Sequence, residues 1–151
     1  MKKDIKKRWI AALQSGLYPK VNGNLRTSAG YCALGVLAEI VGGGRWAANG
    51  SAFNYVTSNG TLCGTALDGA TLKDIRLSVK DQEAIIKMND SEGKSFSQIA
   101  AYLKSNDMDK NYREANRSPE TKARLALGFS KTAWAALPAN ARHSLIAAHG
   151  A

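Results

Sequence analysis

The sequence is poor in cysteine and histidine, and it has no long apolar run. Two cysteines, Cys32 and Cys63, cannot build the dense disulfide framework of a small secreted domain, so we expect a reducing compartment. No apolar stretch approaches the ~20 residues that a membrane-spanning helix needs. The charged N-terminus is not followed by the apolar core and cleavage site of a secretory signal. These absences predict a cytoplasmic protein without a membrane partner.

A chain of 151 residues corresponds to about one ordinary domain, and it can bury a core without disulfides or metals. Hydrophobic residues make up 44% of the sequence and charged residues 22%, which is typical of a soluble globular protein. The composition points to no particular reaction. We expect neither a cofactor nor a metal.

Basic side chains outnumber acidic ones by 21 to 12, which gives a net charge of +9. The excess is uneven, because residues 1–66 carry +6, residues 67–110 carry −1 and residues 111–151 carry +4. A basic surface attracts phosphate-bearing partners over long range. It also keeps a protein in solution, so the charge alone leaves both interpretations open.

Apolar periodicity predicts two helices in the first half of the chain. Residues 3–15 have helical spacing, with Ile5, Trp9 and Leu13 on one face. The almost wholly apolar residues 31–41 fit a buried helix or a buried strand, and their Ala, Leu and Glu content favours the helix.

Capping signals predict four more helices, which begin at Ser78, Ser95, Ser118-Pro119 and Pro138. In the first of these we expect a buried face followed by a stop at Asn89-Asp90. That face consists of Val79, Ile85, Ile86 and Met88. Residues 105–117 are expected to be a polar linker and residues 131–137 a short turn.

Signals for β structure lie before residue 78. We expect a hairpin or strand over 21–30, a hairpin around Asn59-Gly60, and a short strand over Thr71–Leu77. The whole pattern predicts an α+β fold: a mostly helical single domain with a small β-hairpin or sheet and a C-terminal helical extension. We place the core at 1–106 and the extension at 107–151.

Three segments follow one another in a specific order: RWIAALQSGLYPKVNGNLR, YCALGVLAEI and LSVKDQEAIIKMNDSEGKSFSQIAAYLKS. In that order, over about residues 8–105, they resemble a group of small tailed-phage and prophage proteins with no established activity. The shared features are a Trp helix, a Tyr-Cys-x-Leu-Gly-Val-Leu segment and an Asn-Asp…Ser-Phe…Ile-Ala stretch. Ala33 and Ala38 stand where that group often has cysteines, and residues 107–151 have no counterpart in it. The resemblance implies phage origin and a host bacterial cytoplasm, and it supplies no catalytic residues.

Cys32 is the strongest candidate for a catalytic residue, because it is expected in the first turn of a predicted helix whose dipole could lower a thiol pKa. A Cys-His enzyme also needs a base, and the two histidines, His143 and His149, lie outside the resembling region. The alternative is a small side chain buried in an apolar helix, where free cysteine is common. We favour this second interpretation.

Two other patterns have a functional and a structural interpretation. Residues 42–46, Gly-Gly-Gly-Arg-Trp, could hold a phosphate with Arg45 and stack a base on Trp46, but they match no established phosphate-loop spacing. A flexible turn is the simpler explanation. The corner between the helices at Ser78 and Ser95 could bind in a DNA groove. Its second helix, however, carries only one basic residue, Lys104, which favours a packing role.

The best candidate binding surfaces are the two basic ends of the chain. The candidate contacts are Lys2, Lys3, Lys6, Lys7, Arg8, Arg45, Trp46, Arg113, Arg117, Arg124 and Arg142. Trp9, Tyr112 and Trp134 lie near these charges and could stack on bases, although both tryptophans are expected in the core.

We therefore expect a non-enzymatic phage or prophage accessory protein that acts by binding. The expected partner is anionic: nucleic acid, a nucleoprotein complex or a nucleotide signal, in a role such as countering host defence. Two alternatives remain open at this point. One is an inhibitor that docks on a host protein through apolar surface, and the other is a Cys32-dependent enzyme.

Overall fold

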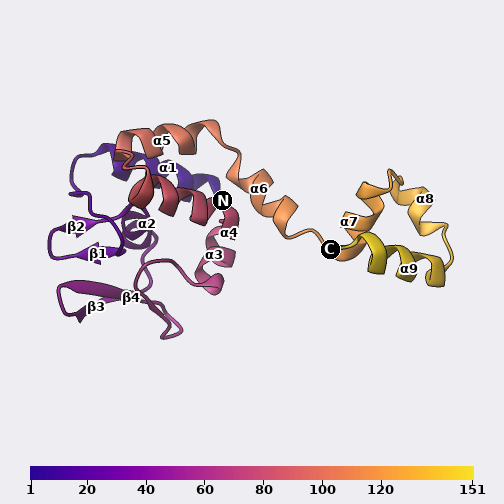
Figure 1. Cartoon of the computed structure of the whole chain (residues 1–151), viewed down its shortest axis with the longest axis horizontal. Helices are drawn as coiled ribbons and strands as arrows, with labels where there is room; N and C mark the ends of the chain where they lie inside the picture. The colour runs from indigo at the N-terminus through magenta and orange to yellow at the C-terminus, as the bar shows by residue number, and fades with distance from the viewer. The chain divides into compact units, whose positions relative to one another are not determined.

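The computed structural model describes all residues, 1–151, and has nine α-helices and five short strands (Figure 1). The fold is α+β and mostly helical, as predicted. The chain forms two compact units, Met1–Tyr112 and Arg113–Ala151, and all strands belong to the first. None of the helices is both long and apolar enough to cross a lipid bilayer.

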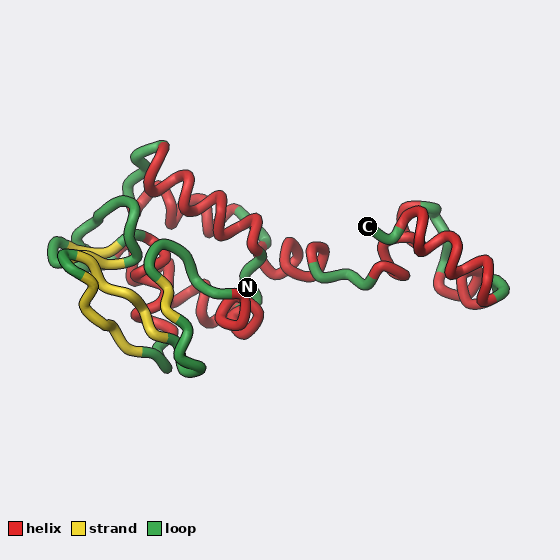
Figure 2. Tube along the Cα trace, turned by 60° about the horizontal axis from the view of Figure 1, so that its bottom comes forward, coloured by secondary structure: helices red, strands yellow, loops and turns green.

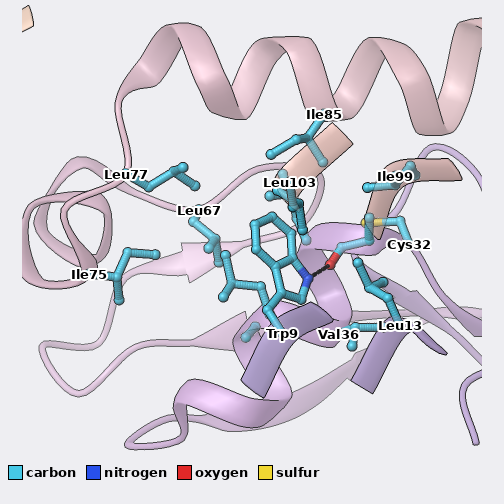
Figure 3. Close-up of a cluster of buried hydrophobic side chains, with 14 of the residues drawn as sticks. Trp9, Leu13, Cys32, Val36, Leu67, Ile75, Leu77, Ile85, Ile99 and Leu103 are labelled. Atoms are coloured by element: carbon cyan, nitrogen blue, oxygen red, sulfur yellow. Dashed lines mark hydrogen bonds between the residues drawn. The ribbon is translucent and has the colours of Figure 1, made fainter. Parts of the chain in front are cut away.

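Helix α1 (Lys3–Gln14) packs on α2 (Ala33–Val41) through the face predicted from its spacing. Ile5, Trp9 and Leu13 are buried, and Trp9 is completely inaccessible. The indole Nε1 of Trp9 donates a 2.9 Å hydrogen bond to the Ala33 carbonyl at the start of α2 (Figure 3). This bond lets a polar ring atom enter the core without an unsatisfied donor.

The apolar segment after residue 31 is a helix, as favoured, and six of its nine residues are buried. Gly35 lies where α2 passes the backbone of Leu25. A Cβ at position 35 would stand 1.7 Å from the Leu25 carbonyl oxygen, so this crossing requires glycine.

The sheet has the order β2-β1-β4-β3, with β5 also paired to β4 and all pairings antiparallel. The strands gather on one side of the first unit (Figure 2). Their bounds are β1 Arg26–Thr27, β2 Gly30–Tyr31, β3 Arg45–Asn49, β4 Ala52–Val56 and β5 Leu62–Cys63. The predicted Asn59-Gly60 turn does join β4 to β5. The prediction of a flexible turn through Arg45-Trp46 was wrong, because both residues lie in β3 and pair with β4.

The predicted strand over Thr71–Leu77 was also wrong, because α3 (Gly69–Ile75) occupies this segment. The Asp68 side chain accepts a 3.1 Å hydrogen bond from the Thr71 amide and so caps the helix. Leu72 and Ile75, three residues apart, then point into the core.

Helix α4 (Val79–Ile86) begins at Ser78 as predicted, and the Ser78 hydroxyl accepts from the Asp81 amide at 3.0 Å. Ile85 is buried, whereas Val79 is exposed and not part of the core face. The helix does not stop at Asn89-Asp90: a π-helical turn continues it over Lys87–Ser91.

Asn89 explains this longer helix, because its buried side chain bridges three segments. Its Oδ1 accepts from the Ala33 amide at 3.2 Å, and its Nδ2 donates to the Val21 carbonyl at 3.0 Å. The π-helical turn aims the amide at both partners. Such turns commonly mark a specific structural or functional demand.

Helix α5 (Phe96–Ser105) has the predicted Ser95–Gln98 capping box and packs against α1. Its inward face consists of four buried residues at helical spacing: Phe96, Ile99, Ala100 and Leu103. The predicted linker at 105–117 is instead largely helical, because α6 spans Met108–Ala115 and buries Met108.

The second unit contains α7 (Pro119–Ala126), α8 (Lys131–Ala135) and α9 (Ala139–His149). Ser118 caps the start of α7 as predicted. The expected turn at 131–137 was wrong in part, because Ser130 caps the short helix α8 within it. Trp134 is buried, packs edge-on against Phe129 and donates from Nε1 to Glu120 at 2.7 Å. Ala123 and Trp134 therefore form the centre of this small unit.

The Gly35 crossing yields a stability prediction. We expect Gly35→Ala to lower the free energy of unfolding by at least about 2 kcal/mol, because the new methyl group overlaps backbone that cannot move away. Gly69→Ala is the matched control, since a Cβ there meets nothing within 4 Å, and its effect should stay within about 1 kcal/mol. Chemical denaturation measures the free energy of unfolding of both variants. Equal stability of the two would contradict the claim that position 35 requires glycine.

Candidate anion-binding groove

A groove of about 630 Å³ lies in the first unit, beside α1 and the junction of α5 with α6. This volume is within the usual range for small-ligand sites. It is lined by Met1, Lys3, Lys6, Lys7, Ile10, Lys104, Ser105, Asn106, Asp107, Met108 and Asp109. Four of these residues are lysines, and Met1, Ile10 and Met108 provide apolar surface.

The lysines are positioned by two packed helices. Lys3 and Lys7 stand one turn apart on α1, on the side away from the core residues Ile5 and Trp9. Lys104 comes from the last turn of α5, which packs against α1. The groove is therefore a product of the α1–α5 contact.

Two of the four ammonium groups have partners. The Lys6 Nζ donates to the Asn106 carbonyl at 2.5 Å, and the Lys104 Nζ donates to Gln14 Oε1 at 3.3 Å. Lys3 and Lys7 are exposed and form neither an ion pair nor a hydrogen bond through their side chains. These two cations are available to an incoming anion.

The two acidic residues of the groove are engaged with the protein itself. Asp107 Oδ1 accepts from the Lys110 amide at 3.0 Å at the start of α6. Asp109 pairs with the Arg76 guanidinium at 3.2 Å. Because both carboxylates already have partners, they oppose an anionic ligand less than two unpaired carboxylates would.

Of the predicted N-terminal contacts, the groove gathers Lys3, Lys6 and Lys7 but not Lys2 or Arg8. The Arg8 guanidinium instead donates to the Ile40 carbonyl at the end of α2. Lys104, for which the sequence suggests only a contact to DNA, completes the groove. No local signal in the sequence links it to α1.

The other predicted contacts lie elsewhere. Arg45 and Trp46 are on β3, where the Trp46 indole donates to Glu39 Oε2 at 2.6 Å. Arg113, Arg117, Arg124 and Arg142 belong to the second unit.

Three arginines of the second unit have partners within it. Arg117 pairs with Glu114 at 3.7 Å, Arg142 pairs with Glu120 at 3.8 Å, and Arg124 donates to the Phe129 carbonyl at 2.8 Å. These side chains help hold the unit together, which makes them less available to a ligand than Lys3 and Lys7.

Cys32 is the N-cap of α2, and its sulfur accepts from the Gly35 amide at 3.4 Å. The residue is only 6% exposed, and burial raises the pKa of its thiol to about 11. A thiol with that pKa is protonated at neutral pH, so Cys32 lacks the thiolate that a nucleophile needs. The two histidines, His143 and His149, lie in the second unit, whereas both cysteines belong to the first.

The burial of Cys32 yields a prediction about its reactivity. In the folded protein at pH 7.5 we expect iodoacetamide to modify Cys32 at least about 10-fold more slowly than a free cysteine, because the raised pKa and burial both suppress the thiolate. In guanidinium chloride the rate should become normal. Peptide mapping by mass spectrometry separates Cys32 from Cys63, and rapid modification of folded Cys32 would revive the enzyme hypothesis.

No curated protein sequence and no solved structure matches the chain. Residues 1–107 match a family described as a domain of unknown function, DUF8296. The matched region contains the whole sheet, helices α1 to α5 and all four groove lysines. The chain therefore belongs to the DUF8296 family.

Proposed function

We propose that this protein is a non-enzymatic accessory protein of a phage or prophage and acts by binding a phosphate-bearing partner in the lysine groove. The observation that carries the proposal is the pair of unpaired ammonium groups, Lys3 and Lys7, at the rim of a groove with an apolar lining. The three-segment resemblance to phage proteins supports the origin. A role in countering host defence belongs to the same proposal.

Phosphate is the chemistry that fits these groups. Ammonium groups bind phosphate as mobile point charges without demanding one geometry. The apolar side chains Ile10 and Met108 would contact the uncharged part of a ligand, such as a base or sugar. A free nucleotide and the exposed end of a nucleic acid, alone or in a nucleoprotein complex, share this chemistry.

The alternatives have less support. The most exposed large apolar side chains of the first unit, Leu17, Leu62 and Val79, come from a loop, a strand and a helix. They do not follow one helix face or strand, as an apolar docking surface for a host protein would. A Cys32 enzyme is disfavoured by the buried, protonated thiol.

Native mass spectrometry of freshly purified protein, together with its 260/280 nm absorbance ratio, tests the proposal first. A discrete extra mass that is lost on denaturation, or a high ratio, supports an anionic ligand and gives its size class. A clean apo mass with a protein-like ratio favours the inhibitor hypothesis, and a pull-down from host lysate then follows.

Charge reversal in the groove provides the second test. With ATP as a probe nucleotide, we expect K3E/K7E to weaken binding at least about 10-fold and to flatten its salt dependence, because two phosphate contacts become repulsive. K73E/K80E is the matched control: it reverses two exposed lysines of α3 and α4 that lie outside the groove. Isothermal titration measures both variants, and equal losses would assign the effect to net charge rather than to the groove.

A further inference from the structure

Arg26 occupies the centre of an aromatic cluster on the sheet. Its guanidinium carbon lies 4.7 Å from the ring centroid of Phe53, 5.0 Å from that of Tyr31 and 5.4 Å from that of Trp46. All three distances are within the range of a cation–π contact. We call these four residues, Arg26, Tyr31, Trp46 and Phe53, the Arg26 cluster.

The strand register explains the cluster. Arg26 on β1 is directly opposite Tyr31 on β2 and Phe53 on β4, so these side chains share one face of the sheet. Trp46 on β3 is opposite Tyr55, two residues beyond Phe53, which places its ring on the same face. The rings of Tyr31 and Trp46 meet edge to face at 5.9 Å.

The guanidinium is held in place but its donors are unused. The Arg26 side chain forms no hydrogen bond and no salt bridge, and the residue is half-buried rather than covered. Glu39, the single acidic residue between Asp4 and Asp68, accepts the hydrogen bond from the Trp46 indole. A fixed, planar cation with unpaired N–H groups is arranged to receive an oxyanion in bidentate fashion.

The neighbours of Arg26 indicate which oxyanion. Single-stranded nucleic acid binds to surfaces that combine cations with aromatic rings, and its bases also stack on guanidinium planes. An acidic peptide would use the charge but has no need of three aromatic rings. The cluster belongs neither to the lysine groove nor to the small cavity of the second unit. Its half-buried side chains extend over four strands without an enclosing pocket, which suits a nucleic-acid strand better than a free nucleotide.

We propose that this sheet face binds single-stranded nucleic acid, with Arg26 donating to a backbone phosphate and the half-buried rings of Tyr31 and Trp46 flanking a base. The site is separate from the lysine groove, and the proposal does not depend on the function proposed for that groove.

Fluorescence anisotropy with a labelled oligothymidylate of about 12 nucleotides tests the proposal on the full chain. Arg26→Lys keeps the charge but removes the planar fork, and we expect it to weaken binding at least about 10-fold. Arg45→Lys is the matched control, because Arg45 is an exposed arginine on the opposite face of the same sheet, and its affinity should stay within about twofold of wild type. Equal affinity of R26K and wild type would overturn the proposal, as would no binding of the oligonucleotide by wild type.

A second pair of variants avoids the packing of the cluster. Ala48 is exposed and lies opposite Phe53, so Ala48→Glu adds a negative charge beside the cluster without filling the core. We expect it to weaken binding at least about fivefold, whereas Asn49→Glu on the other face should change it by less than about twofold. Equal effects of A48E and N49E would overturn the assignment to this face. Thermal melting checks that every variant is folded.

A competition experiment and a comparison of the groove and sheet variants distinguish the possible ligands and sites. Free dTMP at millimolar concentration should not displace the oligonucleotide. Full displacement would overturn the proposal of a strand and identify a mononucleotide as the ligand of this face. If K3E/K7E abolishes oligonucleotide binding and R26K does not, the strand lies in the groove; the sheet proposal then fails while the proposed function stands. The reverse pattern supports the sheet and shows that the groove does not bind this strand, while the ATP titration still decides the function of the groove.

Discussion

The first unit depends on the burial of Trp9 between α1 and α2. A tryptophan can be completely buried only if its indole N–H has a partner, and the Ala33 carbonyl provides it at 2.9 Å. Figure 3 shows this ring among side chains from both halves of the unit, including Leu67, Ile85 and Leu103. Since one face of α1 is fixed inward in this way, its lysines must lie on the outside, along the edge that meets α5.

Local signals in the sequence were reliable where a cap or a turn decides the structure. Ser95 with Gln98 gives a complete capping box, and Asn59-Gly60 joins two strands, because both features depend on residues within three or four positions. The strand predicted over Thr71–Leu77 was wrong, because the β-branched residues of this segment favour a strand only when the helix cap before it is ignored. The Asp68 cap was present in the sequence, and it decides in favour of the helix.

Both candidate sites were only partly predictable, because each depends on contacts between distant segments. Lys3, Lys6 and Lys7 follow from the basic N-terminal helix, but Lys104 joins them only through the packing of α5 on α1. In the sequence Trp46 is a candidate for stacking on a base, with a flexible turn as the simpler interpretation, and nothing singles out Arg26. Its role follows from the pairing of β1 with β4, between residues 27 positions apart, and nothing near Arg26 in the sequence specifies that register.

The Asn89 side chain couples parts of the chain that would otherwise loosen independently. It satisfies the Ala33 amide, one of the donors that every helix start leaves without an internal partner, while the Asp90 carboxylate accepts from the Gly23 amide at 3.0 Å. The start of α2, the loop after Pro19 and the π-helical turn are thus a single hydrogen-bonded junction, and none can open without exposing the others. In hydrogen exchange, the Ala33 amide would behave as part of the global unfolding unit although it stands at a helix terminus, where fraying is normally fastest.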